Sequence, residues 1–186
     1  MKLVSFLNKN SVERAGIFYQ DTIFDIENAG KTAGLNFPST MDRLLLDWEK
    51  CIDSLYKLFE KIKNGSIESE LDFSNIKLLS PVPHPTSCRD GYAFRQHVEA
   101  ARRNRGVEMI PEFDQYPVFY FTNHNAVFGL GDILVEDDHL MQLDFELEVA
   151  IVIAKRGKNI TSDKADDYIA GYMIMNDFSA RLLQME

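Results

Sequence analysis

The stretch from Leu143 to Val149 alternates apolar and acidic side chains without a break. Successive side chains of a β-strand point to opposite faces. Asp144, Glu146 and Glu148 would therefore share one face, each about 7 Å from the next. Crowded carboxylates repel one another and lose water near a core, and a hard cation would offset both penalties. The pattern predicts either a cation site or an ordinary half-solvated strand with an acidic outer face.

Two apolar runs follow and predict strands that enter a core. Residues 150–154 continue the acidic stretch without a polar face, and residues 169–175 form the second run. The second run delivers Asn176 and Asp177 at its end. An acid at the end of a core strand is a frequent site position, and it is also a frequent turn residue. We therefore predict Asp177 at a strand end, either as a site residue or in a turn.

A candidate acid–histidine pair lies nearer the N-terminus. Residues 90–105 read as a helix with a basic end. Asp90 and His97 are seven residues apart, about two helical turns, so the two side chains would share a face. A histidine next to a carboxylate can transfer protons in catalysis. A histidine that only makes structural hydrogen bonds explains the spacing as well.

Composition excludes several classes of function. The 186 residues carry a net charge of −9, which argues against a general affinity for nucleic acid or anionic membranes. Cys51 and Cys88 are too few for a disulfide framework and lack metal-ligand spacing. No window approaches a membrane span, and the apolar segment 1–7 is too short for a signal peptide. A cytoplasmic protein is the expectation.

The elements that precede these residues read as a scaffold. Residues 3–7, 15–19 and 22–26 predict three antiparallel strands, with Gln20-Asp21 as a two-residue turn. A long helix is expected from a cap at Ser39 to a stop at Asn64-Gly65. Its apolar residues recur at helical spacing and predict one buried stripe: Leu44, Leu45, Trp48, Ile52, Leu55, Phe59 and Ile62.

Prolines in segment 80–85 predict a stiff, extended connector, because proline disfavours helix at the residue before it. We place a domain boundary there. Residues 1–80 would form a small N-terminal domain of β-sheet plus helix. Residues 81–186 would form the N-terminal part of a metal-binding catalytic core.

Three segments, taken in this order, resemble the fumarylacetoacetate hydrolase family. They are residues 89–97 (RDGYAFRQH), residues 144–148 (DFELE) and residues 176–181 (NDFSAR) with Gln184. The resemblance covers roughly residues 80–186. It implies an α+β fold with a mostly-β core, a mixed β-roll, and a small N-terminal α+β domain.

The resemblance also implies a site. Four carboxylates would hold a divalent cation: Asp90, Glu146, Glu148 and Asp177. Ligation by oxygen alone points to Mg²⁺ or Ca²⁺, with Mn²⁺ also suitable. His97 would act as the general base. The residues matched to substrate contacts are Tyr92, Tyr120, Gln184 and Arg103, with Arg105 as an alternative register for the arginine.

The reaction implied by the resemblance is hydrolysis of a carbon–carbon bond in a 1,3-diketo acid of the fumarylacetoacetate or acylpyruvate type. His97 would take a proton from water, and the metal would act as a Lewis acid and stabilise an enolate. Two alternatives stay open. One is a decarboxylase, isomerase or hydratase of keto acids within the same family, and the other is a catalytically inactive family fragment.

Family cores continue past the point at which this sequence ends, with further strands and further site residues. We therefore expect a core that is incomplete at its C-terminus, which a second polypeptide could complete. The partners expected are a small keto acid substrate and a second copy of the chain in a homodimer, and neither nucleic acid nor membrane.

Overall fold

The computed structural model describes residues 1–69, 71 and 76–184. The chain divides into two compact units. One combines Met1–Pro83 with Phe128–Glu186, and the other is His84–Val127. The domain boundary expected between residues 80 and 81 stays a prediction.

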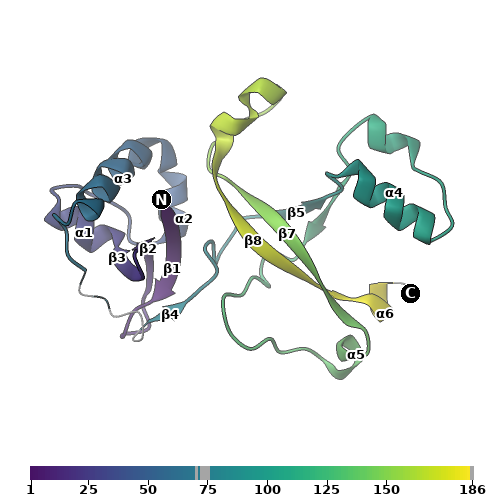
Figure 1. Cartoon of the computed structure of the whole chain (residues 1–186), viewed down its shortest axis with the longest axis horizontal. Coiled ribbons are helices and arrows are strands. Elements are labelled where there is room, and N and C mark those ends of the chain that lie inside the picture. The colour runs from purple at the N-terminus through teal and green to yellow at the C-terminus, as the bar shows by residue number, and fades with distance from the viewer. Residues whose placement is uncertain (70, 72–75, 185–186) are drawn as a thin grey trace. The chain divides into compact units, whose positions relative to one another are not determined.

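The N-terminal residues form a four-stranded antiparallel sheet with the order β3-β2-β1-β4 (Figure 1). Its strands are β1 (Lys2–Leu7), β2 (Glu13–Tyr19), β3 (Thr22–Asp25) and β4 (Lys77–Leu78). The three strands predicted here are confirmed. Gln20 and Asp21 both have positive φ, 46° and 58°, which is the backbone of a tight two-residue hairpin turn.

Helices of this unit differ from the prediction in two places. α1 (Ile26–Thr32) was not expected. It begins because the Asp25 carboxylate caps it by accepting from the backbone N–H of Asn28, 3.0 Å away. The single long helix is instead two helices, α2 (Met41–Leu46) and α3 (Trp48–Lys63), which meet at Asp47. The N-cap of α2 is Thr40 and not Ser39.

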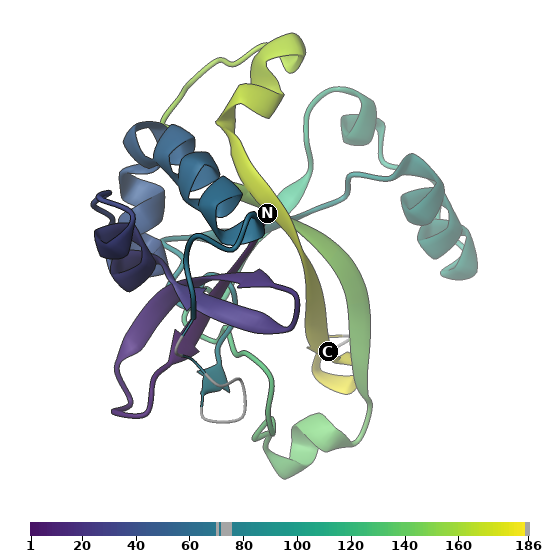
Figure 2. The same ribbon diagram turned by 60° about the vertical axis from the view of Figure 1, so that its left-hand side comes forward.

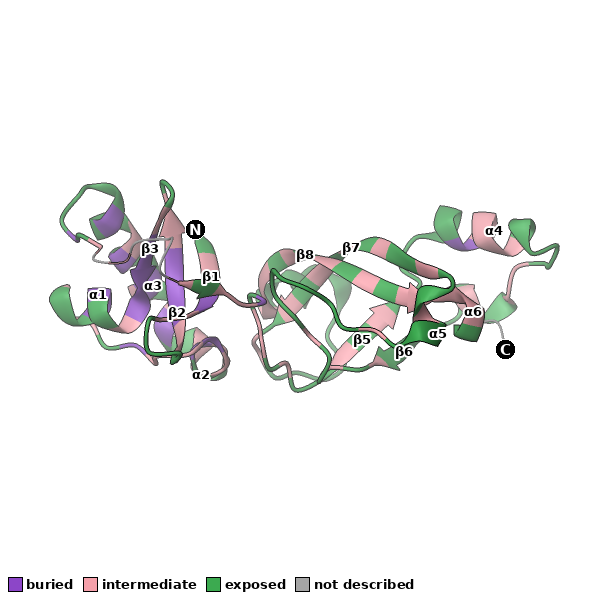
Figure 3. Ribbon diagram, turned by 90° about the horizontal axis from the view of Figure 1, so that it is seen from below, coloured by how far each residue is buried: buried purple, intermediate pink, exposed green. Residues whose placement is uncertain are grey.

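The buried core lies between these helices and the sheet, as the purple segments of Figure 3 show. The predicted stripe is largely right, since Leu44, Leu55 and Ile62 are buried. Cys51 and Leu58 are also buried, whereas the predicted Ile52 is only half-buried. Among the residues that the structure describes, no helix is both long and apolar enough to cross a membrane.

The unit His84–Val127 contains an antiparallel pair of strands, β5 (Cys88–Gly91) and β6 (Phe119–Thr122). Two helices lie between them in sequence, α4 (Arg95–Asn104) and the 3₁₀ helix η2 (Pro111–Asp114). The predicted start of this helix at Asp90 is therefore wrong, since α4 begins at Arg95. Cross-strand pairing with β6 takes residues 88–91 out of the helix, so Asp90 and His97 do not share a helical face.

A long antiparallel hairpin is formed by β7 (Leu143–Ile153) and β8 (Ile169–Ala180), and Figure 2 shows its twist. Its connection contains the 3₁₀ helix η3 (Ser162–Tyr168). Short helices flank it, α5 (Asp137–Leu140) before β7 and α6 (Arg181–Gln184) after β8. β8 continues past Met175, so Asp177 lies inside a paired strand and not at a strand end as predicted.

The apolar face of this hairpin is exposed, which contradicts the expectation that residues 150–154 enter a core. Leu147 is 71% exposed and Ile174 is 77% exposed. Ile151 and Ile153 are exposed too, and the acidic face is the more buried of the two (Figure 3). An alternating pattern predicts which residues share a face, but it does not reveal which of the two faces is covered.

Candidate functional site

Three carboxylates gather on one face of the β7–β8 hairpin. Glu146 and Glu148 share that face because they are two residues apart on β7. Asp177 on β8 is the direct cross-strand partner of Glu146, so it joins the same face. Carboxylate oxygens of Glu148 and Asp177 lie within 4.8 Å of each other. The prediction that the acids of segment 143–149 share one face is confirmed, and the strand register places Asp177 on the same face.

Arg181, the first residue of α6, binds the same end of the hairpin. Its Nη1 lies 2.7 Å from Oε1 of Glu146, and its Nη2 lies 3.0 Å from Oδ2 of Asp144. These contacts raise the pKa of Arg181, with Glu146 as the main cause. The backbone N–H of Phe145 and, next, Arg181 lower the pKa of Asp144. Arg181 therefore favours the charged form of Asp144.

Arg181 had no role in the sequence-based prediction, although it lies in the segment 176–181 that carries the family resemblance. An arginine four residues after Asp177 does not by itself indicate a functional role. Its partners depend on how β7 pairs with β8, which places Leu143 opposite Ala180 and so brings α6 beside the start of β7. Gln184, a predicted substrate contact, accepts from Nη1 of Arg181 at 2.9 Å.

The donor set on this face fits a divalent cation. Carboxylate oxygens are the ligands that Mg²⁺, Ca²⁺ and Mn²⁺ prefer. The acids of this face are Asp144, Glu146, Glu148 and Asp177. Arg181, which pairs with Asp144 and Glu146, contributes one positive charge. Glu146 is 33% exposed, so part of its charge is withdrawn from water.

Two further predicted residues meet in the unit His84–Val127. Asp90 on β5 is the cross-strand partner of Tyr120 on β6, and the Tyr120 hydroxyl donates to Oδ2 of Asp90 at 2.5 Å. Tyr92 follows β5, and its side chain is exposed. Its backbone N–H donates to the Val118 carbonyl at 3.0 Å. The pairing of β5 with β6 therefore orients the Asp90 carboxylate.

His97 and Arg103 both lie on α4, and both are exposed. They are six residues apart, which is not a whole number of turns, so they leave the helix on different faces. The alternative arginine, Arg105, is the C-cap residue of α4 and is exposed as well. The three residues are accessible, as a proton-transferring base or a binder of a substrate carboxylate must be.

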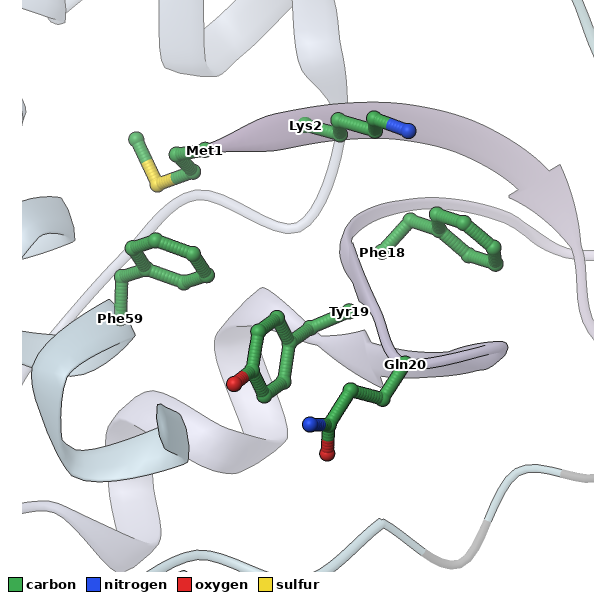
Figure 4. A pocket seen from close by; sticks show the side chains of 6 residues that line it. All are labelled: Met1, Lys2, Phe18, Tyr19, Gln20 and Phe59. Carbon is green, nitrogen blue, oxygen red and sulfur yellow. The ribbon is translucent and has the colours of Figure 1, made fainter. Parts of the chain in front are cut away.

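A hollow of about 240 Å³ lies on the N-terminal sheet (Figure 4). Half of its lining residues are aromatic, and Tyr19 meets Phe59 edge to face with ring centres 5.6 Å apart. The other lining residues are Met1, Lys2, Phe18 and Gln20. These six include neither a carboxylate nor a histidine, so the acidic hairpin face is the better candidate site.

The sequence matches the family described as "Fumarylacetoacetate (FAA) hydrolase C-terminal" over residues 86–186, which is more than half of the chain. The chain therefore belongs to the fumarylacetoacetate hydrolase family, as the resemblance predicted.

Relatives with assigned names align over most of the chain. Oxaloacetate tautomerase YisK of Bacillus subtilis is 30% identical over 179 residues, 90% of this chain and 56% of the relative. The mitochondrial oxaloacetate tautomerase fahd2 of Xenopus laevis is 28% identical over 191 residues, covering 100% of this chain and 54% of the relative.

A solved structure shares the fold. It is maleylpyruvate hydrolase from Sphingobium sp. SYK-6 in complex with manganese(II) and pyruvate, with a TM-score of 0.62 and 20% identity. The match covers 96% of this chain and 58% of that one. The chain thus spans little more than half the length of each of these three proteins. The α+β class is that of the family fold.

Proposed function

We propose that this chain belongs to a divalent-cation-dependent enzyme that acts on 2-keto acids. The observation that carries the proposal is the position of Asp177 opposite Glu146, with Glu148 on the same face, in a member of this family. On the family's pattern, Asp90 would be the fourth ligand. The hydrogen bond from Tyr120 would then fix the direction of the Asp90 carboxylate.

The cation would be Mg²⁺, Ca²⁺ or Mn²⁺, because all the proposed ligand atoms are carboxylate oxygens. Manganese in the Sphingobium maleylpyruvate hydrolase supports the choice of a hard divalent ion. Such an ion supplies Lewis-acid activation of a carbonyl oxygen.

Protein residues would do the remaining work. His97 is the proposed general base, since it is an accessible histidine on α4. Arg103 would bind the substrate carboxylate, because guanidinium and carboxylate match in charge and geometry. Tyr92 and Gln184 would donate to substrate oxygens, and Tyr120, whose hydroxyl proton is given to Asp90, would contact the substrate.

Two reactions fit this set of residues. In the first, His97 takes a proton from water, the water oxygen attacks one carbonyl of a 1,3-diketo acid, and the adjacent carbon–carbon bond breaks. The released carbon then takes up a proton. In the second, a proton moves between carbon and oxygen of a keto acid without bond cleavage. The two oxaloacetate tautomerases that align over 90% and 100% of the chain favour the second reaction.

Product analysis separates the two reactions. The chain is incubated with Mn²⁺ and either acetylpyruvate or freshly dissolved enol-oxaloacetate. Hydrolysis splits acetylpyruvate into acetate and pyruvate, which mass spectrometry detects. Tautomerisation speeds the decay of the enol absorbance without changing the mass.

Variants link the activity to the site. His97→Ala and Glu148→Gln should each lower the rate at least about 100-fold, the usual contribution of a general base or a site carboxylate. His139→Ala, at a half-buried histidine on α5, and Glu136→Gln, at the exposed N-cap of the same helix, are the matched controls and should keep the rate. Absence of both reactions with Mg²⁺, Ca²⁺ and Mn²⁺ would overturn the proposal.

A further inference from the structure

Asp144 is not among the proposed cation ligands, yet both of its carboxylate oxygens are engaged. Oδ1 accepts from the backbone N–H of Phe145 at 2.9 Å. Oδ2 lies 3.0 Å from both Nε and Nη2 of Arg181. One edge of the guanidinium is therefore fixed on Asp144.

The other end of the same guanidinium reaches two proposed site residues. Nη1 of Arg181 lies 2.7 Å from Oε1 of Glu146 and 2.9 Å from Oε1 of Gln184. A guanidinium is planar and rigid, so fixing its Nε–Nη2 edge also fixes the direction of Nη1. The direction from which Arg181 contacts Glu146 and Gln184 is thus set by Asp144.

We propose that Asp144 is a positioning residue of the cation site and that it acts through Arg181. By binding the guanidinium, Asp144 shares its positive charge and so weakens its hold on Glu146, which would leave Glu146 better able to bind a cation. This inference rests on the proposed function, because it needs Glu146 to be a ligand.

Because Asp144 shares the positive charge of Arg181, its loss should weaken cation binding. A guanidinium 2.7 Å from Glu146 competes with any cation that binds the same carboxylate. With Asp144 present, that positive charge is divided between two carboxylates. With asparagine in its place, Arg181 would be left to pair with Glu146 alone. Cation binding should then weaken, and the weakening should require Arg181.

The experiment is a double-mutant cycle on Mn²⁺ affinity, measured on the full chain from the electron paramagnetic resonance signal of free Mn²⁺. Asp144→Asn should weaken binding about fivefold, which is the scale of a partly exposed ion pair. In the Arg181→Gln background the same substitution should change the affinity less than about twofold. Asp144→Glu, which keeps the charge, should recover most of the affinity.

Asp163→Asn is the matched control, because it removes the same charge from an exposed residue of η3. If Asp144→Asn weakens Mn²⁺ binding no more than Asp163→Asn does, the proposal is wrong. It is equally wrong if Asp144→Asn weakens binding to the same extent with and without Arg181, since Asp144 would then act as a plain negative charge. Thermal melts of the apo variants exclude a loss of fold as the cause.

A different result would show that the proposed function is wrong. The unaltered chain would bind no Mn²⁺, or Glu148→Gln would leave the binding unchanged. Either result overturns the cation site, and the role of Asp144 with it. Binding that Glu148→Gln weakens, together with an inert Asp144→Asn, overturns the role of Asp144 alone.

Discussion

At the scale of single residues, Glu146 and Asp177 form a costly pair. They are direct partners across β7 and β8, and like charges in that position destabilise an antiparallel pair. Arg181 offsets part of the cost at Glu146. Under the proposed function, a divalent cation bound at this face would offset the cost further.

Tyr120 allows a test of the Asp90 carboxylate. Tyr120→Phe removes the hydroxyl that donates to Asp90 but keeps the ring. We expect at most about 1 kcal/mol of lost stability, the net value of one hydrogen bond. Mn²⁺ affinity should fall severalfold, because Asp90 loses a fixed orientation. Calorimetric titration measures the Mn²⁺ affinity. Tyr56→Phe, at an exposed tyrosine of α3, is the control. An unchanged affinity would exclude this orienting role.

At the scale of elements, one half-buried arginine joins two strands and a helix. Arg14 on β2 binds the Asp25 carboxylate at the end of β3, 2.6 Å away, and Glu27 in α1, 2.7 Å away. Pairing with Asp25, which is buried, raises the pKa of Arg14. The Asp25 carboxylate also caps α1. The end of the sheet and the start of the helix therefore depend on the same charge pair.

Arg14→Gln should destabilise the N-terminal sheet by about 3 kcal/mol, because it leaves a buried carboxylate without its cation. Chemical denaturation followed by circular dichroism measures the change. Lys31→Gln is the control. Lys31 also pairs with Glu27, but it is 62% exposed, so its loss should cost at most about 0.5 kcal/mol. Equal effects of the two substitutions would contradict the role given to Arg14.

Local patterns predicted the elements whose formation depends on neighbouring residues. The turn at Gln20-Asp21, the strand from Leu143 and the shared face of Glu146 and Glu148 follow from short-range rules of chain geometry. α1 was missed although Asp25 followed by Asn28 is a recognisable cap signal.

Long-range strand pairing determines the features that no local sequence pattern could predict. The helix predicted over residues 90–105 does not include Asp90 and Gly91, because their pairing with β6 makes them part of a strand. The partner of Glu146 depends on the register between β7 and β8, which no local pattern determines. For the same reason the contacts of Arg181 with Asp144 and Glu146 became visible only in the structure.

At the scale of the whole molecule, the hairpin has an apolar face that the described residues leave exposed. Phe145, Leu147, Val149 and Ile174 are each more than 60% exposed on this face. Contiguous apolar patches of this kind usually mark an interaction surface. The homodimer expected from the family resemblance stays a prediction, and this face gives it a place to be tested.

Leu147→Lys should reduce self-association of the chain, because it puts a charge in the middle of the apolar face. Sedimentation velocity at several concentrations measures the association. Leu134→Lys is the control, since Leu134 is 97% exposed and lies outside the hairpin. A chain that stays monomeric at every concentration and does not bind a hydrophobic dye would contradict the prediction that this face drives association.

Equilibrium dialysis with Mn²⁺ shows whether the acidic face of β7 and β8 binds a divalent cation. We expect one bound ion per chain at saturation, lost in the double variant Glu148→Gln, Asp177→Asn and kept in Asp163→Asn. An unaltered chain that binds no Mn²⁺, or a double variant that binds it as well as the unaltered chain, would contradict cation binding at this face.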